Sequence, residues 1–255
     1  MSVEAQNRAK KSFGRKLDLP PIFREIRLRE AGNAFAHAQK IAAEEGAGTL
    51  VWVGRFDLVE FAVVLEPEEP LASARRALYV GLAALADALA VHAPAEMPLH
   101  YDFPATLKFN HGLIGGGQLA WPLGAKEKER PDWLVFGAMV RMHILDNLEP
   151  GERGIAASLE EEGFDNDDLN SRVLVESFTR HLMVHMHEWQ ANGFENVARS
   201  YLARIPSEPD VERKIDGAGD LLIRSKGKLD VKKQKLLPAI ERALWLDHKS
   251  GEILL

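Results

Sequence analysis

Three consecutive glycines, Gly115, Gly116 and Gly117, are the part of the sequence best suited to binding chemistry. Residues without a Cβ let a ligand approach the backbone closely, and their amide groups can bind a carboxylate or a phosphate. The next residue, Gln118, offers a side-chain donor to the same ligand, or faces solvent. Glycines here can equally serve a β-bulge or close strand packing. The sequence therefore predicts either a ligand-binding backbone or a tightly packed one.

A second candidate site lies in the short segment 54–57, where an arginine follows a glycine. The planar guanidinium group of Arg55 suits a carboxylate or a phosphate. The nearby acidic residues Asp57 and Glu60 offer the competing interpretation, an ion pair within the chain. We predict Gly54 and Arg55 as ligand-binding residues, with Arg55 also a candidate catalytic cation.

Lys108 and Arg141 are the other candidate catalytic cations. Strand alternation places Lys108 with Thr106 and Asn110, so that it lines a pocket or lies on the surface, and the surface is favoured. Arg141 interrupts an apolar strand and needs a partner if it is buried. A structural ion pair and a ligand contact are both open for Arg141.

Thiol and metal chemistry are disfavoured by the sequence. The chain has no cysteine, which excludes disulfides, thiolate metal sites and a cysteine nucleophile. His181 and His185 share a helix face at a spacing of four residues. The His-Glu-x-x-His order is missing, and Met and Leu residues are interleaved, so we expect no metal site.

Composition limits the class of protein. The chain has 255 residues, is 46% hydrophobic and carries a formal net charge of -6. It can form one large core with a small appendage, and its acidic balance disfavours a nucleic-acid partner. No apolar run reaches the roughly 20 residues that a bilayer span needs, and no signal-type core follows the basic start. We expect a cytoplasmic protein that is not bound to a membrane.

Hydrophobic periodicity predicts alternating helices and strands that position these residues. The expected helices cover residues 30–45, ending at Gly46, and 71–91, 169–192 and 196–203. The expected strands cover residues 49–53, 59–65, 106–110 and 133–142, with a turn at 111–112 and a partner strand from Leu113. Residues 149–168 are expected as a surface excursion with a helical piece at 156–162.

Three units are expected along the chain. Residues 1–19 are interpreted as a mobile arm and residues 20–205 as the main domain. Residues 206–255 form a small C-terminal domain, introduced by a linker at 206–210. Short β segments at 211–215, 220–224 and 228–232, separated by glycines, predict a small β-rich unit there.

The order of these elements resembles the catalytic domain of biotin and lipoate protein ligases. In the first half of the chain, the residues that carry the resemblance are Gly54-Arg55 in the place of an adenylate loop, residues 102–106 at a KWPND-type motif and residues 113–116 at the lysine hairpin. In the second half they are residues 136–141 at a GIGIN-type strand, residues 157–161 at a TSL-type segment and residues 188–194 at the end of a helix with a Gly-Phe turn. The resemblance covers residues 20–205, and the tail is similar to the small C-terminal domain of an uncharacterised bacterial subgroup. It implies an α+β fold, a mixed β-sheet flanked by helices with a small β-rich C-terminal domain. It also implies ATP with Mg as cofactor, biotin or lipoate as ligand, a biotinyl or lipoyl acceptor domain as partner, and a homodimer.

The sequence departs from the family pattern where the chemistry should take place. The position of the catalytic lysine holds Leu113, and the Asn and Asp of the KWPND-type motif are replaced by Ala105 and Thr106. Joining a carboxylate to ATP brings two anions together, and fixed cations lower that barrier. Leu113 supplies no charge, so standard ligase activity should be impaired or altered.

Two functions follow from this resemblance. The first is a ligase or acyltransferase in which Arg55, Lys108 or Arg141 replaces the missing lysine, or which binds a small carboxylic acid or its adenylate with altered activity. The alternative is a non-catalytic binding or protein-interaction module that docks an acyl-carrier or lipoyl-type domain. Fold alone does not decide between the two.

Overall fold

The computed structural model describes residues 16–94, 98–145, 154–165, 168–228 and 230–254. The strands are β1 (Arg24–Leu28), β2 (Thr49–Gly54), β3 (Leu58–Leu65), β4 (Leu99–Asp102), β5 (Thr106–Phe109), β6 (Gly112–Ala120), β7 (Leu134–Arg141), β8 (Val211–Ile215), β9 (Leu221–Ser225) and β10 (Val231–Gln234). The helices are α2 (Ala34–Glu45), α3 (Leu71–Ala74), α4 (Ala77–Ala90), α5 (Ser171–Asn192), α6 (Glu195–Leu202) and α7 (Leu236–Arg242).

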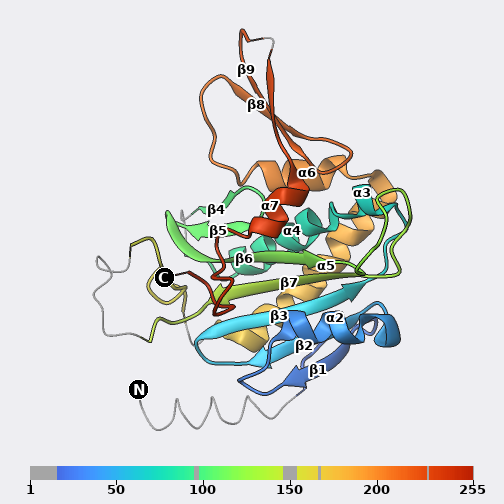
Figure 1. The fold of residues 1–255 in the computed structure, drawn as a ribbon. Helices are drawn as coiled ribbons and strands as arrows, with labels where there is room; N and C mark the ends of the chain where they lie inside the picture. The colour runs from blue at the N-terminus through green and yellow to red at the C-terminus, as the bar shows by residue number, and fades with distance from the viewer. Residues whose placement is uncertain (1–15, 95–97, 146–153, 166–167, 229, 255) are drawn as a thin grey trace.

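The strands form two sheets (Figure 1). A seven-stranded sheet has the order β1-β2-β3-β7-β6-β5-β4, and a three-stranded sheet has the order β10-β9-β8. β1 runs parallel to β2, and the other pairings are antiparallel. The expected α+β class, a mixed sheet flanked by helices with a small β-rich C-terminal unit, is confirmed.

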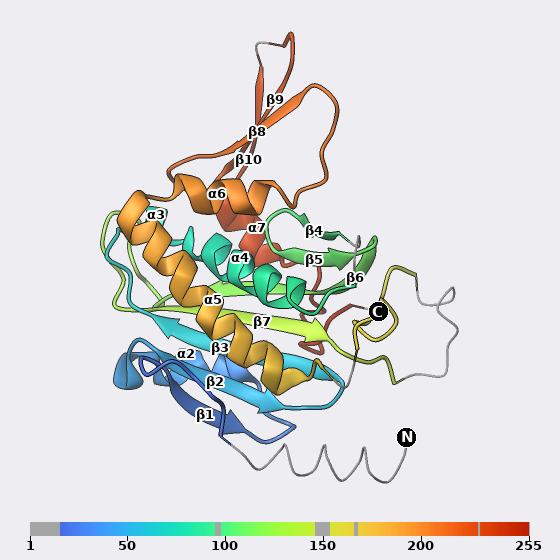
Figure 2. The ribbon, with the colours of Figure 1, turned by 180° about the vertical axis from the view of Figure 1, so that it is seen from behind.

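Helices cover both faces of the large sheet (Figures 1 and 2). On the face that carries α4, α5 and α6, Phe178 of α5 contacts Phe61 and Phe136 at ring-centroid distances of 4.4 and 5.7 Å. On the opposite face, Phe35 of α2 lies directly over Gly137. Because successive strand residues point to opposite faces, β2, β3 and β7 bury both sets of side chains.

α2 begins at Ala34, later than the predicted start at residue 30. Asn33 is the N-cap and accepts the N–H of Ala36 at 2.7 Å, while the carboxylate of Glu60 accepts the N–H of Ala34 at 2.6 Å. These bonds satisfy amide groups that the first helical turn leaves without partners. The predicted end at Gly46 is confirmed, and its φ of 72° is a conformation that glycine tolerates.

The single helix predicted over residues 71–91 is wrong, because the segment consists of α3 and α4. At the junction, the N–H of Arg76 donates to Ser73 and that of Leu78 donates to Arg75, at 3.0 and 3.1 Å. These hydrogen bonds join residues three positions apart, as in a 3-10 helix. They replace the bonds four positions apart that would continue an α-helix, so α3 and α4 are separate helices. Arg75 also forms an ion pair with Glu127, which ties the junction to the loop after β6.

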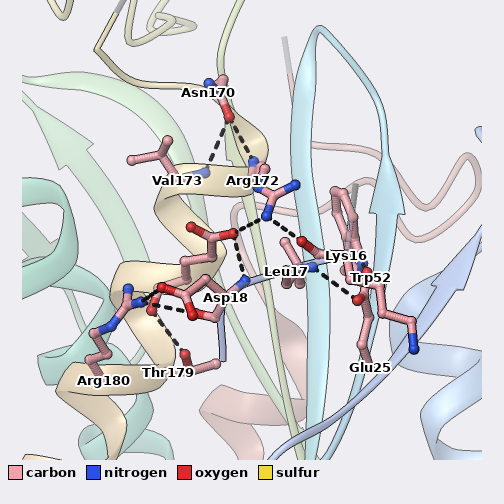
Figure 3. Close-up of polar contacts among 11 residues, drawn as sticks. Lys16, Leu17, Asp18, Glu25, Trp52, Asn170, Arg172, Val173, Thr179 and Arg180 are labelled. Atoms are coloured by element: carbon pink, nitrogen blue, oxygen red, sulfur yellow. Dashed lines mark hydrogen bonds and ion pairs between the residues drawn. The ribbon is translucent and has the colours of Figure 1, made fainter. Parts of the chain in front are cut away.

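Residues 16–19 lie against α5 and the edge strand β1 (Figure 3). The N–H of Leu17 donates to Glu25 at 3.0 Å, and the N–H of Asp18 donates to Glu176 of α5 at 2.8 Å. β1 itself was not among the predicted strands. Residues 1–15 of the expected arm lie outside the described residues.

The helical piece predicted at residues 156–162 is wrong, because this segment forms turns that pack on the large sheet. The N–H of Leu113 donates to Ile155 at 2.6 Å, and the N–H of Ala157 donates back to Leu113 at 3.0 Å. Leu159 donates its N–H to Arg141 at 3.0 Å and is fully buried. Backbone groups that bond to strands cannot also form the hydrogen bonds of a helix. Part of the expected surface excursion therefore belongs to the core. Residues 149–153 and 166–167 lie outside the described residues.

The C-terminal unit is fastened to the main sheet domain by buried apolar side chains. Ile215, Leu221 and Leu236 belong to the same core cluster as α4. The hydroxyl of Tyr79 in α4 donates to the carbonyl of Gly219 at 2.5 Å. The third strand falls at 231–234 and not at 228–232, and a turn at residues 226–227 follows β9. α7 was not predicted.

The chain after α7 folds back over the large sheet as a short hairpin, drawn in dark red in Figure 1. Leu246 pairs with Ile253, and the N–H of Leu254 donates to Trp245 at 3.0 Å. We call residues 245–254 the cover segment. It lies on the same face of the sheet as α2, over β6 and β7.

Candidate functional site

The β5–β6 hairpin positions the predicted ligand-binding residues. Its turn is formed by Asn110 and His111, with φ values of 45° and 74°, one residue earlier than predicted. Both values fit the left-handed turns that match the twist of a hairpin. The pairing shifts between Leu107 and Lys108, so that Leu113 pairs with Lys108 and Gly116 with Thr106. This irregularity directs Leu113 towards the face that the cover segment occupies.

The three consecutive glycines of β6 contact other residues of the chain. A Cβ on Gly115 would lie 2.0 Å from the carbonyl oxygen of Met139, and one on Gly117 would lie 3.0 Å from Leu82 of α4. A Cβ on Gly116 would lie 2.4 Å from the indole ring of Trp245. The close-packing interpretation therefore accounts for Gly115 and Gly116 in this form of the protein, and their ligand-binding role stays a prediction.

Leu113 lies in a sealed apolar cluster at the position where the resemblance places a lysine. It is 2% exposed and packs with Leu58, Met139, Trp245 and Ile253. An ammonium group placed in this cluster would lose its hydration without gaining a carboxylate from the cluster. The neighbours of Leu113 are apolar and therefore favour a hydrocarbon side chain at this position.

Arg141 lies beneath this cluster and is 7% exposed. Its Nη1 donates to the carbonyls of Leu113 and Ala157 at 3.3 and 3.2 Å, and its Nη2 donates to those of Ile253 and Leu254 at 3.1 and 2.9 Å. Four backbone carbonyls are therefore among the partners of Arg141, for which the sequence left an ion pair and a ligand contact open. Arg141 joins β7, β6 and the cover segment.

Arg55 forms the ion pair with Asp57 that the sequence offered as one alternative. Its Nη2 lies 2.6 Å from Asp57, and its Nη1 lies 3.3 Å from Glu252 in the cover segment. The hydrogen bonds that Arg55 donates to the Asp57 carboxylate raise the pKa of Arg55 above its ordinary value. Burial acts to raise the pKa of Asp57, but the hydrogen bonds and charge of Arg55 lower it overall. A Cβ on Gly54 would lie 2.7 Å from the guanidinium group of Arg27.

The remaining predicted residues are less central. Lys108 lies 2.6 Å from Asp102 and is partly exposed. Gln118 is half-buried and stands opposite Gly137 in the sheet. Glu60, named in the sequence as a partner for Arg55, instead caps α2, and burial raises its pKa.

A cleft of about 330 Å³ lies beside this cluster, between the large sheet and the C-terminal unit. Its walls are the turn before β5, Gly117, α7 and the indole of Trp245. The lining is mostly apolar and includes two basic residues, Lys235 and Arg242, but no acidic residue. A volume in this range suits a small organic ligand, and the charge of the lining favours an anion.

Sequence reasoning missed Trp245, Lys235 and Arg242 as site residues. All three come from the C-terminal unit, where a tryptophan in a charged tail is the only signal that could have indicated a buried contact. The spacing of strands within the main domain carries no information on which distant segment covers them.

His185 of α5 contacts a neighbouring helix. The ring of His185 lies 2.7 Å from Asp87 of α4, and Asp87 also pairs with Arg204. Among the residues that the structure describes, no three His, Cys, Asp or Glu side chains gather as they would around a metal ion. None of the helices in the described part combines the length and apolar character needed to cross a bilayer.

Comparisons with known proteins agree with the geometry. The family described as Biotin/lipoate A/B protein ligase matches residues 19–203. A solved structure of a biotin protein ligase-like protein of unknown function from Silicibacter sp. TM1040 superposes with a TM-score of 0.73 at 23% identity, covering 88% of this chain and 99% of that one. No curated relative matches the chain.

Two solved enzymes share the fold at lower identity. The biotin protein ligase from Aquifex aeolicus, in complex with biotin and ATP, has a TM-score of 0.58 at 13% identity and covers 83% of this chain and 98% of its own. The biotin protein ligase from Leishmania major, in complex with biotinyl-5-AMP, has a TM-score of 0.51 at 17% identity, covering 85% and 99%. These likenesses establish the fold.

Proposed function

Because this chain belongs to the biotin/lipoate A/B protein ligase family, we propose that it binds a small carboxylic acid without converting it to an adenylate. The observation that carries the proposal is the sealed apolar packing of Leu113 at the position where the resemblance places the catalytic lysine. Structures of the same fold hold biotin, ATP or biotinyl-5-AMP, which supports a carboxylic acid as the ligand class.

Adenylation needs preorganised cations at the reacting phosphate, and the candidate cations here already have other partners. Arg55 is paired with Asp57 and Glu252, and Lys108 with Asp102. Arg141 donates to four backbone carbonyls. These three residues therefore do not fit the triphosphate of ATP, and the described residues offer no cluster of three carboxylates or histidines for Mg.

The cleft supports binding of a carboxylic acid without ATP. Its apolar walls suit a ring or an acyl chain, and Lys235 and Arg242 supply positive charge for the carboxylate. Neither cation has an ion-pair partner within the described residues. Lipoate, octanoate and biotin all combine an apolar body with one carboxylate.

Binding and activation can be measured separately on the whole chain. We expect isothermal titration calorimetry to detect binding of octanoate or lipoate, and ATP–pyrophosphate exchange to stay at background with each acid. Lys235→Ala and Arg242→Ala should each weaken binding by about fivefold, because each removes one charge-assisted contact of about 1 kcal/mol.

Lys249→Ala is the matched control, since Lys249 is exposed and does not line the cleft. Its affinity for each acid should equal that of the unmodified chain. Exchange that depends on one of the acids would overturn the non-adenylating part of the proposal. No heat of binding with biotin, lipoate or octanoate would overturn the ligand class.

The alternative function, docking of an acyl-carrier or lipoyl-type domain, is favoured by one feature. The three-stranded sheet projects away from the main domain (Figures 1 and 2) and exposes the basic residues Lys214, Arg224, Lys228 and Lys232. An acidic carrier domain would complement this charge. Binding that weakens steeply with salt would support this function, while the homodimer and the cytoplasmic location stay predictions.

A further inference from the structure

The indole of Trp245 separates two parts of the site. It forms one wall of the cleft, and it also lies directly over Gly116, where a Cβ would come within 2.4 Å of it. Trp245 is 1% exposed. Beyond it lie Leu113, at the position where the resemblance places the catalytic lysine, and Arg141. With the indole in place, the cleft ends before Gly116.

Backbone hydrogen bonds within the cover segment stabilise its hairpin. Asp247 receives the N–H of Gly251 at 2.7 Å and donates its own N–H to Glu252 at 2.8 Å, and Leu254 donates to Trp245 at 3.0 Å. Among the described residues, no backbone–backbone hydrogen bond joins the cover segment to the large sheet. The segment can therefore lift as a unit while its internal hydrogen bonds stay formed.

Side chains attach the cover segment to the sheet domain. Arg141 donates its Nη2 to Ile253 and Leu254, and Arg55 lies 3.3 Å from Glu252, which is largely exposed. The buried Nε1 of Trp245 has no hydrogen-bond partner among the described residues. Burying a donor without a partner costs free energy, so the buried position of the indole is less stable than its apolar contacts alone would make it.

A bend at Ala243 connects the cover segment to α7. Ala243 has φ 33° and ψ 67°, in the left-handed region that residues with a Cβ seldom adopt. Hinges are commonly residues at the end of an element that absorb a change in φ and ψ. Relaxation of Ala243 to an ordinary conformation would swing the cover segment away from β6.

We infer that the cover segment is displaceable and occupies, within its own chain, the place of a carboxylic acid ligand. Once it lifts, the cleft extends over Gly116 to Arg141. The carboxylate then passes from Lys235 and Arg242, which bind it while the cover segment is closed, to the Nη2 of Arg141, which releases the carbonyls of Ile253 and Leu254. The Nη1 of Arg141 stays fixed by Leu113 and Ala157, so the guanidinium group is already oriented for the ligand. The inference rests on the proposed function for the ligand class, whereas the displacement itself can be tested without a ligand.

A reporter thiol measures the displacement, because the chain has no cysteine of its own. Leu113→Cys places the thiol under the cover segment, and Ala84→Cys places one in α4, at a fully buried position. We expect a thiol reagent to label Leu113→Cys at least tenfold faster than Ala84→Cys. Adding Trp245→Ala should raise the rate at the first position and leave the second unchanged. Equal labelling rates at the two positions would overturn the inference, since access would then require global unfolding.

Affinity for octanoate tests the role of Arg141. The apparent affinity of a ligand that competes with the cover segment equals its intrinsic affinity multiplied by the fraction of molecules in which the segment is open. Trp245→Ala raises that fraction and should therefore tighten octanoate binding by about tenfold or more. Adding Arg141→Gln should abolish that gain, and Lys249→Ala should give no gain. Equal affinities of the unmodified chain and Trp245→Ala would contradict the inference. Fast labelling without octanoate binding in every variant would contradict the proposed ligand class and support the displaceable cover.

Discussion

Leu113 lies where the resemblance places a lysine, and its side chain belongs to an apolar cluster closed by Trp245. A charged side chain at this position would have to enter that cluster or displace the cover segment. Residue type and packing are therefore coupled at this position.

Leu113→Lys is expected to destabilise the protein and to leave ATP–pyrophosphate exchange at background. Burying an ammonium group without a partner costs about 3 kcal/mol or more, which thermal denaturation at pH 7 would show as a lower Tm. Burial would lower the pKa of this lysine below its unfolded value of about 10.4. The unfolded state then binds more protons, so the deficit should shrink as pH rises towards that value.

Leu113→Met is the matched control, because it keeps an apolar side chain of similar volume and should cost less than about 1.5 kcal/mol. Exchange activity gained by Leu113→Lys would contradict this expectation. It would mean that the neighbouring groups are still organised for adenylation.

At the scale of elements, the sequence predicted those parts whose own residues determine their structure. β2, β3 and β7 are mostly apolar and fully buried, and α5 carries apolar residues at helical spacing with a glycine at its end. β1 was missed because its five residues, REIRL, carry three charges, and its pairing with β2 determines its conformation. The helix predicted at 156–162 failed because its backbone groups bond to Leu113 and Arg141.

The candidate site was predictable only in part, for a related reason. The glycines, Arg55 and Leu113 could be located from the order of motifs within one domain. The contact of Trp245 with Gly116 and the bonds of the Arg141 Nη2 to Ile253 and Leu254 join residues more than 100 positions apart. No local pattern in the sequence specifies such contacts.

The packing of α4, α5 and α6 predicts a dependence of stability on acid. Asp87 lies 2.7 Å from His185 and pairs with Arg204. Burial acts to raise the pKa of Asp87, but the bonds to His185 and Arg204 lower it overall. Its stabilising effect is then complete above the unfolded pKa of about 3.9 and is lost as pH falls through the folded value.

Asp87→Asn should therefore lower the free energy of unfolding by about 2 kcal/mol at pH 7 and by much less near pH 3. Urea denaturation at both pH values checks this. Asp132→Asn is the control, since Asp132 is exposed and has no ion pair in the described structure. A deficit that is the same at both pH values would refute the charged role of Asp87.

For the whole molecule, the C-terminal unit and the main domain share one core. Ile215, Leu221 and Leu236 pack in the same cluster as the side chains of α4, and Tyr79 bonds to Gly219. Units that share a core cannot unfold independently without exposing apolar surface on both sides. The cover segment is different, since it adds a separate small cluster to the outer face of the sheet.

We therefore expect residues 16–242 to unfold in one cooperative transition. Circular dichroism and tryptophan fluorescence should give coincident urea curves, which is the usual test for two-state behaviour. Leu236→Ala should shift both curves together by about 2–5 kcal/mol, because it leaves a cavity where the C-terminal unit meets the main domain. Leu244→Ala, at a position that is 67% exposed, should leave both curves unchanged. An early transition confined to the C-terminal unit would show that the shared core does not couple the two units.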